Sequence, residues 1–125
     1  MQIEVSNGEL VDKVSILKIK LERISSARKR ANIQKEFDLL QAKMAAIDVT
    51  EESEFFRSLM EINTRLWDIE DQIRVKESRG EFDDAFIQLA RQVYFQNDRR
   101  SQVKREINIQ TGSAIIEEKE YAQYG

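Results

Sequence analysis

The sequence contains no cysteine, no histidine and no proline, and only 4 of its 125 residues are glycine. Without cysteine the chain has no disulfide, no thiolate nucleophile and no sulfur-ligated metal. Without histidine it has no imidazole metal ligand and no side chain with an ordinary pKa near neutrality. Any catalysis would therefore have to use carboxylates, lysine, arginine, tyrosine or the backbone. The absence of proline favours long, uninterrupted helices.

Long apolar runs are also lacking, and neither sign of charge dominates. The 20 basic and 23 acidic residues give a net charge of -3, which disfavours nucleic acid as a partner because no global basic field attracts it. No apolar run is long enough to cross a membrane, and the first residues lack the apolar stretch of a signal peptide. We therefore expect a cytoplasmic protein without membrane contact.

What the sequence does contain is a repeated apolar stripe, which is most regular across residues 50–80. At about 1.5 Å per residue a helix of this length would be roughly 40 Å long, so other helices or a second copy of the chain must lie along it. The apolar residues recur at alternating spacings of four and three, which places them on one side of this helix: Phe55, Leu59, Ile62, Leu66, Ile69 and Ile73.

The same spacing predicts three further helices. They lie at about residues 8–24, from residue 27 or 31 to 47, and from residues 81–84 to 108. Short connections would make consecutive helices antiparallel neighbours. We predict one all-α domain over residues 1–125. Its architecture would be an up-and-down helical bundle of four main helices, with one long central helix and a short C-terminal helix.

Local residues at the helix ends support these boundaries. Ser6 and Glu9 have the spacing of a capping box, and Thr50 is expected to cap the long helix. In the C-terminal segment after Gly112, we expect Ile115 and Ile116 to dock a short helix on the bundle.

The long helix has a wider apolar surface than its main stripe, because Phe56, Met60 and Trp67 lie beside that stripe. This surface either contacts two neighbouring helices or forms a dimer face. The first two helices are each only about half as long as the third, which leaves part of it without a partner. We therefore expect a homo-oligomer, with a homodimer as the simplest form.

The fourth helix changes from apolar to basic part-way along its stripe. Residues 91–105 hold five basic residues and one acid, and basic groups inside a bundle are costly unless they are paired or bind an anion. They are either solvated or paired with acids of the third helix or the C-terminal segment, or they form an anion pocket with an arginine fork. The candidate anion-binding residues are Arg91, Tyr94, Asn97, Arg100, Lys104 and Arg105.

A second candidate is an acidic patch on the third helix, formed by Glu70, Asp71 and Glu77 with Arg74 among them. Spacings of four and three favour ion pairs within the helix on an exposed face. The alternative is Mg²⁺ coordination, as in all-α nucleotide pyrophosphohydrolases, which need two acidic pairs on facing helices. No matching acidic pair is evident in the sequence.

A third cluster, Glu9, Asp12 and Lys13, opens the first helix. Its structural interpretation assigns Glu9 to the helix cap and Asp12 to the positive end of the helix dipole.

Four phrases together resemble an uncharacterised family of short proteins found in bacteria and marine cyanophages: GELVDKVSILKIKLERI, LWDIEDQIR, LARQVYFQNDRRSQVKREIN and GSAIIEEKEY. The resemblance covers nearly the whole chain and implies no known activity. If a phage encodes the chain, it implies the host cytoplasm as the location. The phrase RLWDIEDQI is also similar to the first helix of all-α chorismate mutases, although the spacing to their acidic pairs is not met.

We expect a non-enzymatic binding or interaction module. Its basic cluster on the fourth helix, backed by acids of the third, would hold an anionic small molecule or an acidic segment of a partner. The alternative is a small all-α enzyme that resembles a Mg²⁺-dependent nucleotide pyrophosphohydrolase or a chorismate mutase. Outside that alternative we expect no cofactor.

Overall fold

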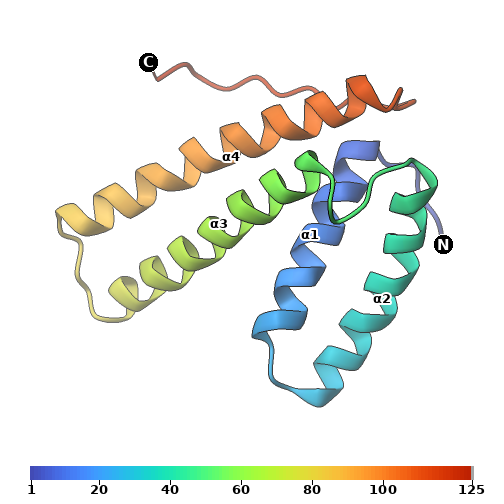
Figure 1. Cartoon of the computed structure of the whole chain (residues 1–125). Coiled ribbons are helices and arrows are strands. Elements are labelled where there is room, and N and C mark those ends of the chain that lie inside the picture. Colours follow the sequence, from blue (N-terminus) through green and yellow to red (C-terminus); the bar gives the residue numbers. More distant parts are fainter. Residues whose placement is uncertain (125) are drawn as a thin grey trace.

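The computed structural model describes residues 1–124 and contains four helices and no strand in that range (Figure 1). The all-α class and the four main helices are therefore confirmed, and α3 is a long helix of 25 residues. The helices are α1 (Asn7–Arg23), α2 (Ala27–Ala46), α3 (Glu54–Ser78) and α4 (Asp84–Gln110).

The helices form two hairpins, α1 with α2 and α3 with α4, and α1 joins them. Helix α1 contacts each of the other three helices, whereas no Cα atom of α2 lies within 8 Å of a Cα atom of α3 or α4. The expectation that all consecutive helices are neighbours is therefore wrong for α2 and α3. The connection between α2 and α3 is short. However, α1 packs against the α3–α4 hairpin, and α2 packs on α1 instead.

The core forms where the apolar stripes of the four helices meet. Phe56 is 1% exposed and Met60 packs against the same cluster, so the wider apolar surface of α3 contacts neighbouring helices within the chain. The buried cluster contains Val11, Val14, Leu17, Phe37, Met44, Val49, Phe56, Leu59 and Ile107.

Helix starts follow the expected chemistry in part. Ser6 caps α1, since its Oγ accepts a hydrogen bond of 3.1 Å from the backbone N of Glu9. Thr50 is not the cap of α3, because a turn intervenes and the helix begins after Ser53. The backbone N of Thr50 instead donates to Ser53 Oγ at 2.9 Å.

The expected C-terminal helix is absent. Residues 113–124, which we call the tail, form no helix and run back along α4 (Figure 1). Ile115 and Ile116 are exposed rather than docked. Gly112 takes a positive φ of 65°, which turns the chain out of α4. So short a segment gains little from helix formation alone. None of the helices in residues 1–124 is long and apolar enough to cross a membrane.

Candidate functional site

The first turn of α1 lies directly on α4. The backbone N of Gly8 donates a hydrogen bond of 2.6 Å to Asn108 Oδ1. A Cβ atom at Gly8 would stand 2.9 Å from the carbonyl carbon of Lys104, so only glycine allows this approach of the two backbones. The contact brings the acidic residues of the first turns of α1 against the basic side of α4.

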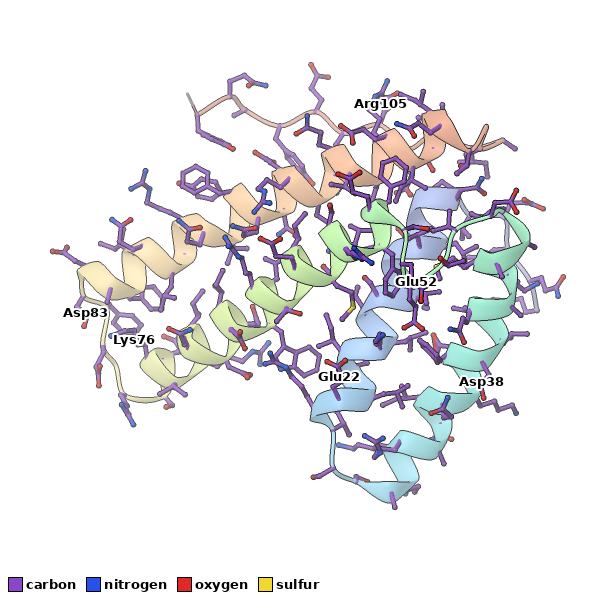
Figure 2. The ribbon with its side chains drawn as sticks, viewed as in Figure 1. Glu22, Asp38, Glu52, Lys76, Asp83 and Arg105 are labelled. Atoms are coloured by element: carbon purple, nitrogen blue, oxygen red, sulfur yellow. The ribbon has the colours of Figure 1, made fainter. Side chains whose placement is uncertain are left out.

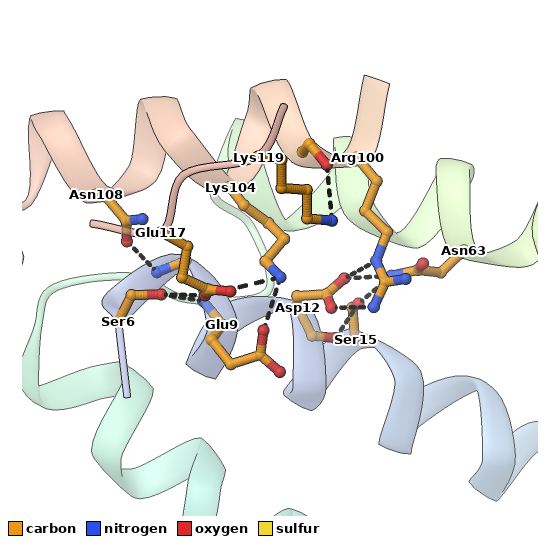
Figure 3. Close-up of polar contacts among 12 residues, drawn as sticks. Ser6, Glu9, Asp12, Ser15, Asn63, Arg100, Lys104, Asn108, Glu117 and Lys119 are labelled. Atoms are coloured by element: carbon orange, nitrogen blue, oxygen red, sulfur yellow. Dashed lines mark hydrogen bonds and ion pairs between the residues drawn. The ribbon is translucent and has the colours of Figure 1, made fainter. Parts of the chain in front are cut away.

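Asp12 and Arg100 form the centre of this contact (Figure 3). Arg100 Nε donates to Asp12 Oδ1 at 2.9 Å, and a terminal guanidinium nitrogen donates to Asp12 Oδ2. The pair is bidentate, with the Asp12 side chain 1% exposed and that of Arg100 28% exposed. The hydrogen bond to Asp12 raises the pKa of Arg100 above its ordinary value, against the opposing effect of burial.

Two further side chains, Asn63 and Ser15, complete the hydrogen bonding around the buried Asp12, one at its carboxylate and one at its backbone oxygen. Asn63 of α3 donates through Nδ2 to Asp12 Oδ1 and to Ser15 Oγ, both at 2.9 Å. Ser15 Oγ donates to the backbone oxygen of Asp12 at 2.6 Å. No buried side-chain polar atom in residues 1–124 lacks a hydrogen-bond partner. The network therefore ties α1, α3 and α4 together without an unsatisfied group.

Lys104 lies one turn further along α4, between two acids (Figure 3). Its Nζ donates to Glu9 Oε2 at 2.6 Å, and Glu117 Oε1 of the tail lies 4.0 Å away. The same Glu117 oxygen accepts a hydrogen bond of 2.9 Å from Ser6 Oγ. Glu9 thus uses its side chain on Lys104, so the expected capping box is only half formed.

On its outer side, away from α1, α4 meets the tail (Figure 2 shows Arg105 there). Arg105 donates to Glu118 Oε1 at 2.7 Å, and Lys119 Nζ donates to Ser101 Oγ at 3.2 Å. A cavity of about 360 Å³ lies open between α4 and the tail. Its lining consists of Ser101, Gln102, Lys104, Arg105, Asn108, Glu117, Glu118 and Lys119. This cavity is the candidate site.

The far end of the tail rests on aromatic rings of α4. The Tyr124 ring lies 5.1 Å from that of Tyr94 and 5.3 Å from that of Phe95, measured between centroids. The Tyr124 hydroxyl donates a hydrogen bond to Asp98 Oδ2. This hydrogen bond, more than burial, raises the pKa of Tyr124 above the ordinary tyrosine value.

The predicted basic residues are divided by the structure rather than gathered into one pocket. Arg100 faces α1, Arg105 faces the tail, and Lys104 contacts acids of both. Arg91 lies over the ring of Phe95, 5.5 Å from its centroid. Of the other two candidates, Tyr94 stacks near the tail and Asn97 is half-buried.

The acids behind the basic residues come from α1 and the tail, not from α3. The expectation of backing by α3 acids is therefore wrong, because Glu70, Asp71 and Glu77 are exposed on another face of that helix. Glu70 Oε1 accepts instead from Arg74 Nε at 2.9 Å, the ion pair within the helix that the spacing favoured. Within residues 1–124 no group of three or more acidic side chains could hold a metal ion.

Sequence reasoning missed the polar groups around Asp12 and at the first turn of α1. Asn63 lies four residues after Leu59, within the face of α3 that contacts α1. A polar residue at a position of the apolar stripe indicates that its side chain needs a hydrogen-bond partner inside the protein. The long-range hydrogen bonds of Ser6 and Asn108 gave no such signal, since each joins residues more than 90 positions apart in the sequence.

The profile of a family described as "Family of unknown function (DUF6165)" matches residues 1–124. The chain belongs to this family. The predicted family resemblance is thereby confirmed. Neither the curated proteins nor the solved structures that were searched give a significant match. For this DUF6165 chain, function must be argued from the candidate site.

Proposed function

We propose that this chain is a binding module whose candidate site on α4 holds an acidic segment of a partner protein. One observation carries the proposal: the chain's own acidic tail pairs with the basic residues of this site and forms one wall of it. Glu118 accepts a hydrogen bond from Arg105 at 2.7 Å, and Glu117 lies 4.0 Å from Lys104. The tail is thus an example, within the chain, of what these cations bind.

Arg100 is not available to a ligand. Asp12 takes both ends of its guanidinium fork, and removing one partner of so buried a pair is costly. Its role is to position α4 on α1. The ligand would contact Lys104 and Arg105 instead, with the Ser101 hydroxyl and the Asn108 amide beside them.

The tail holds this site loosely, so another acidic segment can replace it. Arg105 and Glu118 are 49% and 71% exposed, and exposed ion pairs contribute about 0–1 kcal/mol. Exposed contacts of this kind open at low free-energy cost. An extended acidic segment suits the site better than a small anion, because the cavity is an open track along a helix and small-molecule sites usually enclose their ligand.

A peptide titration tests the proposal. The host is the full chain with Glu117→Gln and Glu118→Gln, which weakens the tail but keeps the folded α4. The probe is a fluorescent peptide with the sequence of residues 113–124, and the readout is anisotropy. We expect saturable binding that weakens as salt rises, and loss of binding for a peptide with glutamine at its three glutamates.

Two variants of the host decide whether binding uses the candidate site. Arg105→Gln should weaken binding by up to about fivefold, the most that an exposed ion pair contributes, whereas Arg28→Gln, at an exposed basic residue on α2, should leave binding unchanged. Equal loss from both variants would mean non-specific charge attraction. No binding of the acidic peptide to the host at any salt concentration would remove the proposal.

A further inference from the structure

The far half of the α3–α4 hairpin is exposed over most of its length, and its last residues, Tyr94 and Phe95, meet the Tyr124 ring of the tail. We call residues 70–95 the arm. None of these residues is buried, whereas α1 lies against the other end of the hairpin (Figure 1). The arm nevertheless carries large apolar side chains, with Phe82 61% exposed and Ile87 50% exposed. Exposed apolar surface gathered in one region is typical of an interaction site.

The outer face of α4 within the arm has a regular order of chemistry. Asp84, Ile87, Arg91 and Tyr94 follow each other at spacings of three, four and three, which places them on one side of the helix. All four are exposed. The ion pairs that the structure forms within the arm include neither Asp84 nor Arg91. This face therefore offers an acid, an apolar residue and a base in line.

We propose that this face binds the same face of a second copy of the chain, with the two α4 helices antiparallel about a two-fold axis at Ile87. In that arrangement residues equally far from the axis on opposite sides meet. Asp84 lies three residues before Ile87 and Arg91 lies four residues after it. The two distances differ by only about 1.5 Å along the helix, so each Asp84 comes close to Arg91 of the second copy. The two Ile87 side chains meet at the axis.

The aromatic residues follow this symmetry less closely. Phe82 lies five residues before Ile87 and Tyr94 lies seven after it. The two rings must therefore span an offset of about 3 Å for Phe82 of one copy to approach Tyr94 of the other. Aromatic pairs of this kind add stability beyond the area that they bury. A surface with this order is complementary to itself, which is the requirement of a two-fold interface.

Charge favours the antiparallel arrangement over the parallel one. A parallel pair would set Asp84 against Asp84 and Arg91 against Arg91, and like charges in contact repel. The contact spans about 18 Å at about 1.5 Å per residue, which is a small interface. Small interfaces of this size belong to weak, transient dimers. We therefore expect association in about the 10–500 µM range of concentration.

The charge pair provides the first test, by sedimentation velocity of the full chain up to about 1 mM. The wild type should approach twice the chain mass of 14.7 kDa. Asp84→Lys alone and Arg91→Glu alone should each weaken the dimer at least tenfold, since each places like charges together. The double variant should restore it. Both residues are exposed, so the fold is retained.

A single cysteine provides the second test, because the chain contains none. Ile87→Cys at the axis should give a disulfide-linked dimer in mild oxidant. Leu39→Cys, on α2 and 60% exposed, is the matched control and should stay monomeric. A wild type that stays at 14.7 kDa throughout, a double variant no better than the singles, or equal cross-linking at both cysteines would each overturn the proposal.

Discussion

The two sides of α4 carry ion pairs of the same chemistry in different surroundings. On the inner side, the Asp12 carboxylate is 1% exposed and shares its hydrogen bonds with an arginine and an asparagine. On the outer side, both members of the Arg105–Glu118 pair are exposed, so this pair can open without uncovering the core. Burial therefore decides the role of each pair: the inner pair fixes the arrangement of helices, and the outer pair is exchangeable.

Removal of the inner acid should give the largest effect. Asp12→Ala leaves the Arg100 guanidinium partly buried without its partner, so we expect the free energy of unfolding to fall by about 3 kcal/mol. Urea unfolding measures this loss. The control is the double variant Asp12→Leu with Arg100→Met, which removes both charges and should recover most of the stability. If the double variant is as unstable as Asp12→Ala, the loss comes from packing rather than from an unpaired charge.

Alanine at Gly8, where α1 meets α4, and at Gly112, where the tail leaves α4, should lower the free energy of unfolding for different reasons. Gly8→Ala forces a Cβ against the Lys104 backbone, so we expect a loss of about 2 kcal/mol. Gly112→Ala meets no neighbouring atom and is strained only by its φ of 65°, so the loss should be about 1 kcal/mol. Thermal unfolding compares them. A neutral Gly8→Ala would show that α1 and α4 do not approach this closely.

Removal of the outer acid should barely change global stability. Glu118→Gln should alter the free energy of unfolding by less than about 0.5 kcal/mol, because the pair is exposed. Hydrogen exchange should rise in the tail and not in α1. A loss comparable to that of Asp12→Ala would mean that the tail belongs to the folding core, and the contrast between the two sides of α4 would fail.

The smallest effect concerns the last contact of the tail. The pKa of Tyr124 is raised by its hydrogen bond to Asp98, so the neutral phenol is the form that binds α4. The contribution of this contact is present below the tyrosine pKa of the free chain, near pH 10, and is lost as pH rises through the higher folded value. Asp98→Asn should lower the Tyr124 pKa.

The phenolate absorbance of the wild type minus that of Tyr124→Phe isolates this titration. An unchanged midpoint in Asp98→Asn would show that the hydroxyl does not use that carboxylate. The matched control is Asp84→Asn, which lies in the arm and should leave the midpoint in place.

Much of the fold could be predicted because it depends on local patterns. The four-three stripes mark each helix, since an amphipathic helix must turn its apolar side inward wherever its partner lies. The Ser6 cap was predictable because its hydrogen bond to the backbone of Glu9 spans three residues. The polar change in the stripe of α4 also pointed to Arg100 and Lys104 as residues that need partners.

The identity of those partners was not predictable from local pattern. Acids of α3 and of α1 look alike in sequence, and Glu70 and Asp12 both have a basic residue within a turn. Both helices lie against α4, so the choice depends on which acids face Arg100 and Lys104. The close approach of Gly8 places the first turns of α1 there. The tail was misassigned for a related reason, because its two isoleucines followed by glutamates and a lysine permit a short helix if only local propensity is considered.

The sequence by itself determined that this chain forms four amphipathic helices without disulfides or histidine chemistry, because composition and periodicity act within one or two turns. Only the tertiary structure decided that α1 is the helix that joins the others, that Asp12 rather than an external anion saturates Arg100, and that the acidic tail covers Lys104 and Arg105. These contacts join residues far apart in the chain, and their free energy depends on burial, which exists only after the helices have packed.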